Sequence, residues 1–174
     1  DAYDAESTDL ISQIYDTLVT FQGNDSQTFS PCLATDWTVS NDSFTWTFHL
    51  RHNVKFSNGN DFTAEDVKYS FNRVLLMRAP ESGVDWIFGQ CMDSNSTTVI
   101  DDYTVHIKLT QSYGGFLSLL PYTIGAIVDK DYVDENGGVV AGQENEWMKL
   151  NPMGTGPYTL DHWTRATEIV LNKN

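Results

Sequence analysis

Positively charged side chains are scarce in this chain. Its 174 residues include 10 lysines and arginines against 24 aspartates and glutamates, a formal net charge of −14. Proteins hold nucleic acids mainly through contacts of lysine and arginine with the phosphates, so this composition argues against a nucleic-acid partner. The acidity says little about other partners, because it fits a highly soluble protein as well as a salty habitat in which dissolved ions screen the repulsion.

Long apolar runs and cysteines are also few. No stretch approaches the roughly 18 apolar residues of a membrane-spanning helix, so we expect no such helix. The two cysteines, Cys32 and Cys91, cannot form a metal site by themselves, and they allow either one disulfide or two buried thiols. The first residues lack the basic and then apolar stretch of a signal peptide, so we expect any export signal to have been removed. Residues 169–174 look like a strand that stops abruptly, and we therefore expect the chain to be a piece of a longer one.

Material for a hydrophobic core is plentiful. Nine phenylalanines, eight tyrosines and five tryptophans contribute to a hydrophobic fraction of 40%, which argues against disorder. The length fits one domain, and a chain of this size buries roughly 70% of its unfolded surface on folding.

Two longer helices are expected. Leu10, Ile14 and Leu18 belong to an apolar stripe at spacings of three and four, which predicts a helix over residues 7–20. Thr63 is expected to begin the other, because a threonine can cap a helix and two acidic residues in the first turn favour the helix dipole. Shorter helices are expected at 116–120 and 129–135.

Strands are expected mainly as antiparallel hairpins. Residues 36–40 and 44–50 flank the turn residues Asn41, Asp42 and Ser43, and aromatic residues alternate along the second strand. Two further hairpins are expected, one from 98–100 and 103–109 and one from 158–163 and 168–171. The fold class is therefore α/β in the mixed α+β sense, with short helices and antiparallel hairpins in one compact unit.

A search for catalytic or metal-binding patterns finds none. His49 and His52 lie three apart in extended chain, where they face opposite sides and cannot chelate one metal as a helical pair could. No Gly-x-Ser-x-Gly elbow is present. The Gly154-x-Gly156 pair is followed by Pro157, which lacks a backbone N–H, and no phosphate-loop lysine follows. We therefore expect no enzyme activity, no catalytic residues, no metal and no cofactor.

Several blocks of sequence carry more specific information about the protein than its overall composition does. Each has a structural interpretation: Trp37, Trp46 and Phe48 as core residues, Arg51 as the partner of a carboxylate or loop carbonyl, and the glycines as turn residues. In this order, however, they resemble the signature of the family 5 extracellular solute-binding proteins, the peptide- and nickel-type receptors of ABC importers. The departures are mild, namely Cys32 where a small residue is usual and Asn58 where aspartate is usual. The blocks are 14–19, 31–40, 44–51, 54–59, 62–67 and 151–158.

The resemblance implies a two-lobed periplasmic-binding-protein type II fold, of which this chain holds one part. Residues 1–20 are expected to belong to the first ligand-binding lobe, residues 21–150 to an extra subdomain of that lobe, and residues 151–174 to the return into it. The second lobe is absent.

The resemblance also implies ligand-binding positions. By position, Tyr3, Asp4 and Ala5 match a loop that faces ligand in peptide receptors. Gly83, Asp85 and Trp86 lie where the subdomain reaches toward the cleft. Trp86 offers an aromatic surface to a ligand, although a partly buried core position is the more common fate of a tryptophan.

The expected function is that of a non-enzymatic, extracytoplasmic receptor. It would capture a dipeptide or oligopeptide and deliver it to an ABC permease in the membrane, as a monomer that is lipid-anchored in the parent protein. Alternatives are a nickel-chelate or oligosaccharide receptor of the same family, an acidic adhesion or interaction module, and a hydrolase accessory domain. Asn-x-Ser/Thr triplets at Asn24, Asn41 and Asn95 fit adhesion slightly better, although chance also explains them.

Overall fold

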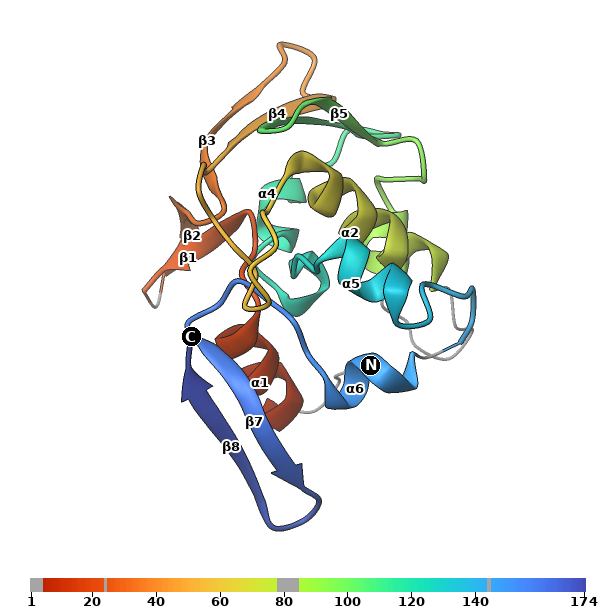
Figure 1. Ribbon diagram of the computed structural model, residues 1–174. Coiled ribbons are helices and arrows are strands. Elements are labelled where there is room, and N and C mark those ends of the chain that lie inside the picture. Colours follow the sequence, from red (N-terminus) through yellow and green to blue (C-terminus); the bar gives the residue numbers. More distant parts are fainter. Residues whose placement is uncertain (1–4, 24, 78–84, 144) are drawn as a thin grey trace.

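The computed structural model describes residues 5–23, 25–77, 85–143 and 145–174, and the side chains of residues 5, 6, 85 and 86 also lie outside this description (Figure 1). The helices are α1 (Ala5–Ile14), α2 (Ala64–Leu76), α3 (Asp85–Gly89), α4 (Phe116–Leu119), the 3-10 turn η1 (Thr123–Gly125), α5 (Lys130–Glu135) and α6 (Glu146–Leu150). The strands are β1 (Val19–Gln22), β2 (Asp25–Pro31), β3 (Ala34–Val39), β4 (Thr45–Leu50), β5 (Thr97–Asp101), β6 (Thr104–Lys108), β7 (Tyr158–Thr164) and β8 (Glu168–Lys173).

Every strand pairing among the residues that the structure describes is antiparallel. A four-stranded sheet has the order β3-β4-β6-β5, and the β1–β2 and β7–β8 hairpins form separate two-stranded sheets. This arrangement confirms the expected class of antiparallel hairpins with short helices. The three predicted hairpins are all present, and the predicted helices at 116–120 and 129–135 correspond to α4 and α5.

The core lies between the four-stranded sheet and α2, which crosses beneath it (Figure 1). Phe48 of β4 and Phe71 of α2 are fully buried, and the Phe71 ring lies 5.3 Å from that of Phe88 on α3. Trp37 and Trp46 pack against this cluster as predicted. Along β4 the pleat turns Phe48 inward while the intervening His49 is exposed, as its alternation indicated.

The start of α2 is fixed by a buried carboxylate. Oδ2 of Asp66 accepts hydrogen bonds from the Thr63 backbone N–H at 2.9 Å and from the Thr63 hydroxyl at 3.2 Å, and Oδ1 accepts from the Lys130 N–H at 3.0 Å. Burial raises the pKa of Asp66. The prediction that this helix begins at Thr63 is therefore confirmed, and the same side chain also holds the start of α5.

The helix predicted over 7–20 is wrong beyond Ile14. The carbonyl oxygen of Ile14 accepts the Gly156 N–H at 2.8 Å, so a distant segment uses the acceptor that would have continued the helix. The carbonyl of Leu18 then accepts the N–H groups of Cys32 and Ala34, which ties the chain to that loop before β1. Leu18 is fully buried, but at a bend rather than in a helix.

The structure also shows the state of the two cysteines and the partner of Arg51. Cys32 and Cys91 are both free thiols, so of the two alternatives the structure has no disulfide between them. Nε of Arg51 donates to the carbonyl oxygen of Cys32 at 3.1 Å, which confirms the loop-carbonyl partner.

A candidate ligand-facing groove

One cavity among the described residues is a groove of about 760 Å³. Its walls come from α1, the second half of α2, η1, α6 and the β7–β8 hairpin, which runs alongside α1 in the lower half of Figure 1. Most of the lining is apolar, including the inward face of α1 and the directly paired residues Trp163 and Ile169 of the hairpin. Such a surface favours apolar groups.

The charged residues of the groove are all cationic. Arg73, Lys149 and Arg165 line it, and none of the described lining residues is an aspartate or glutamate. Lys149 pairs with Glu146 at 2.8 Å, and the Arg165 guanidinium lies 5.5 Å from the centre of the Trp163 ring. The groove therefore suits a group that is apolar and negatively charged.

The ionisable groups that interact with Arg73 are the phenols of two tyrosines. Burial lowers the pKa of its guanidinium, and its interactions with Tyr15 and Tyr69 oppose that shift. Burial raises the pKa of Tyr15 to about 12, and the Tyr15 hydroxyl accepts the Met153 N–H at 3.1 Å. Burial also raises the pKa of Tyr69, whose hydroxyl donates to Oδ1 of Asp134 at 2.5 Å. Both phenols thus remain neutral near Arg73 at physiological pH.

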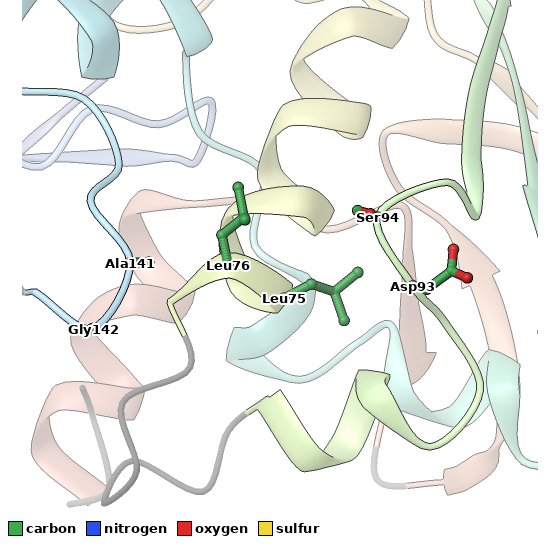
Figure 2. Close-up of a pocket in the computed structure, with 6 residues that line it drawn as sticks. All are labelled: Leu75, Leu76, Asp93, Ser94, Ala141 and Gly142. Carbon is green, nitrogen blue, oxygen red and sulfur yellow. The ribbon is translucent and has the colours of Figure 1, made fainter.

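A second cavity of about 520 Å³ lies at the end of α2. Figure 2 shows Leu75 and Leu76 between the loop of Ala141 and Gly142 on one side and that of Asp93 and Ser94 on the other. Leu76 is half exposed. This cavity can accept a small apolar group, and Asp93 is the carboxylate at its rim.

The six sequence-predicted site residues fall at the margins of the description. Tyr3, Asp4 and Gly83 lie outside the described residues. Ala5 begins α1, and Asp85 and Trp86 begin α3, but the side chains of these three also lie outside the described part. Their role therefore remains a prediction. The groove borders α1, the helix that begins at the predicted residue Ala5. The smaller cavity lies at the end of α2, the helix that precedes the predicted residue Gly83 in the sequence.

The residues of the groove were missed at the sequence level. Arg73, Lys149 and Arg165 are far apart in the chain and meet only because β7–β8 returns to α1. The available signal was the rarity of cations in so acidic a sequence.

No group of three or more histidine, cysteine, aspartate or glutamate side chains within the described ranges is placed to hold a metal ion. None of the described helices combines the length and apolar character that crossing a bilayer requires.

The β7–β8 hairpin carries a titratable histidine, which provides a pH prediction. Nδ1 of His162 lies 2.7 Å from Oδ2 of Asp161, and Nε2 lies 3.6 Å from Oε1 of Glu168. The hydrogen bond to Asp161 raises the pKa of His162. The charged imidazole therefore stabilises the hairpin fully below the unfolded pKa near 6.5, and this contribution is lost as the pH rises through the folded value. NMR titration should give a pKa above 6.5 that falls in Asp161→Asn; an unchanged pKa in that variant would contradict the assignment.

Comparison with known proteins identifies a family. A family model described as bacterial extracellular solute-binding proteins, family 5 Middle, matches residues 28–174. The dipeptide-binding protein of Escherichia coli K12 is 32% identical over 180 residues, which are 96% of this chain and 32% of that protein. The resemblance inferred from the sequence blocks is thereby confirmed.

Solved structures agree. The periplasmic binding protein DppA of Helicobacter pylori, in complex with the peptide STSA, superposes with a TM-score of 0.82 at 32% identity, covering 99% of this chain and 36% of that one. The binding protein MoaA of A. tumefaciens R10, in complex with mannopinic acid, gives a TM-score of 0.85 at 26% identity over 99% of this chain and 33% of that one. The chain thus has the fold of part of a two-lobed periplasmic binding protein, and it spans about a third of the length of the curated relatives it matches.

Proposed function

Because this chain belongs to the family 5 bacterial extracellular solute-binding proteins, we propose that it is part of a receptor that captures a dipeptide or oligopeptide outside the cytoplasm and delivers it to an ABC permease. The observation that carries the proposal is the similarity, at 32% identity each, to a dipeptide-binding protein and to a structure with a bound peptide. The receptor is a monomer without catalytic activity, held to the membrane by a lipid anchor in the parent protein.

The proposed mechanism is capture between two hinged lobes. Residues 1–20 and 151–174 contribute to the first lobe, residues 21–150 form its extra subdomain, and the second lobe lies elsewhere in the parent protein. Contacts between the first two segments support this division: the Thr155 hydroxyl donates to Oδ2 of Asp16 at 2.9 Å, and Gly156 bonds to Ile14. The ligand binds the closed form better and so shifts the population toward it.

The ligand-facing positions in this proposal are those implied by the family resemblance. Tyr3, Asp4 and Ala5 precede or begin α1, and Gly83, Asp85 and Trp86 precede or begin α3. In this arrangement Trp86 stacks on the peptide. Half of a two-lobed cleft encloses little surface, so the 174-residue chain alone binds peptide weakly or not at all.

The test begins with native mass spectrometry of the full-length parent as purified. We expect a distribution of peptide masses carried through purification. A discrete metal-containing adduct would identify the ligand as a nickel chelate instead of a peptide, and a carbohydrate mass would identify it as an oligosaccharide. A protein that carries no ligand and binds none of the three in titration would favour the adhesion module.

A substitution then tests the proposed contact. In the parent, Trp86→Ala should weaken peptide binding about tenfold in calorimetry, because one aromatic contact contributes on the order of 1 kcal/mol. The matched control is Trp147→Ala, which removes a half-exposed tryptophan of α6. Equal affinities of Trp86→Ala and the unmodified parent for peptide would show that Trp86 is not part of the site. Micromolar peptide binding by the 174-residue chain would contradict the expectation that half of the cleft binds weakly.

A further inference from the structure

Two Asn-x-Ser/Thr triplets, beginning at Asn41 and at Asn95, lie within the described residues, and the proposed function uses neither of them. A third begins at Asn24, which lies outside the described part. This pattern is the acceptor for N-glycosylation, in which the asparagine amide receives the sugar and the hydroxyl two positions later is required for recognition. In a folded protein both side chains have to be exposed and free of competing contacts, and the two described triplets differ in this respect.

The first triplet forms the tip of the β3–β4 hairpin. Asn41, Asp42 and Ser43 are all exposed, and the hairpin projects from the molecule at the top of Figure 1. β3 is an edge strand of the four-stranded sheet, so no described strand lies beside it on its outer side. A large enzyme can therefore reach this tip without moving another element of the described fold.

The hydrogen bonds of the tip leave the two required side chains free. The Ser43 backbone N–H donates to the Ser40 carbonyl at 2.8 Å and closes the turn. The central side chain points back into the turn, because Oδ1 of Asp42 accepts from the Ser40 hydroxyl and from the Phe44 N–H at 3.0 Å. Within the described residues, no hydrogen bond engages the side-chain amide of Asn41 or the hydroxyl of Ser43. Both groups are thus available on one short turn.

The second triplet has the same pattern but a buried hydroxyl. Asn95 is exposed, whereas Thr97 is only 3% exposed and its Oγ1 is buried without a partner in the described part of the chain. Thr97 begins β5 and pairs with the buried Ile107 of β6. The middle residue, Ser96, is also 3% exposed, and its hydroxyl accepts the Asp93 N–H at 2.9 Å. Presenting this triplet to an enzyme would require the start of β5 to separate from the sheet.

We propose that Asn41 is an N-glycosylation site of the folded protein and that Asn95 is not. The donor is an oligosaccharide linked to a polyprenyl phosphate. Nδ2 of Asn41 forms a bond to the anomeric carbon of the first sugar, the bond from that carbon to the phosphate oxygen breaks with its electron pair leaving on the phosphate, and the amide loses one proton. The inference rests on the proposed function, because it takes the receptor to lie outside the cytoplasm, where the sugar-transferring enzyme meets folded acceptors.

The position also tolerates a bulky substituent. The β3–β4 tip lies at the opposite end of the molecule from the β7–β8 hairpin, and neither of the two cavities is lined by a residue of the tip (Figure 1). Val39, at the end of the edge strand β3, is 45% exposed. A glycan two positions further along would shield this apolar side chain and hinder the pairing of the open edge with another chain.

The experiment is glycopeptide mass spectrometry of the full-length parent purified from its native cells. We expect a glycan on the peptide that contains Asn41 and none on the peptide that contains Asn95. In the same cells, Asn41→Gln and Ser43→Ala should each lose this glycan completely, whereas Ser43→Thr keeps the hydroxyl and should retain it. Asn95→Gln is the matched control and should leave the glycan content of the parent unchanged. Thermal melts establish that the variants fold.

Three results would overturn the proposal: an unmodified peptide at Asn41, a glycan on Asn95 at equal occupancy, or a glycan that persists in Ser43→Ala. The proposed function has a separate readout, the peptide that the parent carries through purification. A parent that is glycosylated at Asn41 but binds no peptide would refute the proposed function and support this inference. A parent that carries peptide and no glycan would do the reverse.

Discussion

Gly154→Ala is expected to reduce the free energy of unfolding of the chain by about 3 kcal/mol, because the backbone around this site cannot move aside for a new methyl group. A Cβ at position 154 would overlap the carbonyl oxygen of Ile14 and lie 2.9 Å from Cδ1 of Tyr15. The Gly154 carbonyl also accepts the Ser57 N–H at 3.0 Å, so a shift of this segment would break a second contact.

Urea denaturation monitored by tryptophan fluorescence measures the change. Gly156→Ala should behave similarly, since its Cβ would lie 2.6 Å from the carbonyl carbon of Ile14. Gly89→Ala is the matched control, because a Cβ there meets nothing within 4 Å. If the variants at 154 and 89 unfold at the same denaturant concentration, the close approach of these segments is refuted.

Asn58→Asp is expected to destabilise the chain by roughly 3 kcal/mol at neutral pH, because it replaces an amide donor to a buried carboxylate by a second negative charge. Nδ2 of Asn58 donates to Oδ2 of Asp129 at 2.7 Å, and Nδ2 of Asn60 donates to the same oxygen at 2.8 Å. Asp129 is only 2% exposed. The asparagine at position 58 therefore supplies an amide donor to the carboxylate that caps α5.

The pH dependence of this variant identifies its cause. A second carboxyl beside the buried Asp129 raises the pKa of one of the two above its unfolded value, so the penalty is present above the raised pKa and recedes as the pH falls through it. Asn172→Asp is the control, since the Asn172 amide also donates to a carboxylate, Oδ1 of Asp161 at 2.8 Å, but Asp161 is exposed whereas Asp129 is buried. A penalty at Asn58 that does not shrink in acid, or one equal to that at Asn172, would contradict the explanation.

The sequence predicted those parts of the fold that local chemistry determines. The hairpin around Asn41 to Ser43 and the start of α2 at Thr63 follow from turn residues, alternation and helix-start preferences within a few positions. The β1–β2 hairpin was missed because β2 reads Asp-Ser-Gln-Thr-Phe-Ser-Pro, a mostly exposed and polar strand without an apolar alternation. The end of α1 was misplaced because Gly156, 142 positions after Ile14, takes the last carbonyl.

The site could be predicted only through the family resemblance. Asp4 was predicted from a resemblance to a ligand-facing loop of peptide receptors, and Trp86 from its place where the subdomain is expected to reach toward the cleft; no local pattern distinguishes either residue. The cations of the groove come from three separated segments, so their convergence depends on the whole chain path. The blocks that identified the family are mostly structural: Gly154 and Gly156 permit close backbone contact, and Asn58 supports Asp129.

The hydrogen bonds between the two ends of the chain also set an order of events during synthesis. Tyr15 and Asp16 find their partners in Met153 and Thr155, so these bonds span 138 and 139 positions. Contacts of such separation form late, because a long loop must close before they bring any gain. The side-chain hydrogen bonds of Tyr15 and Asp16 to this segment therefore form only after the polypeptide up to Thr155 has left the ribosome. Until that stage, these two side chains lack the partners that they have in the folded chain.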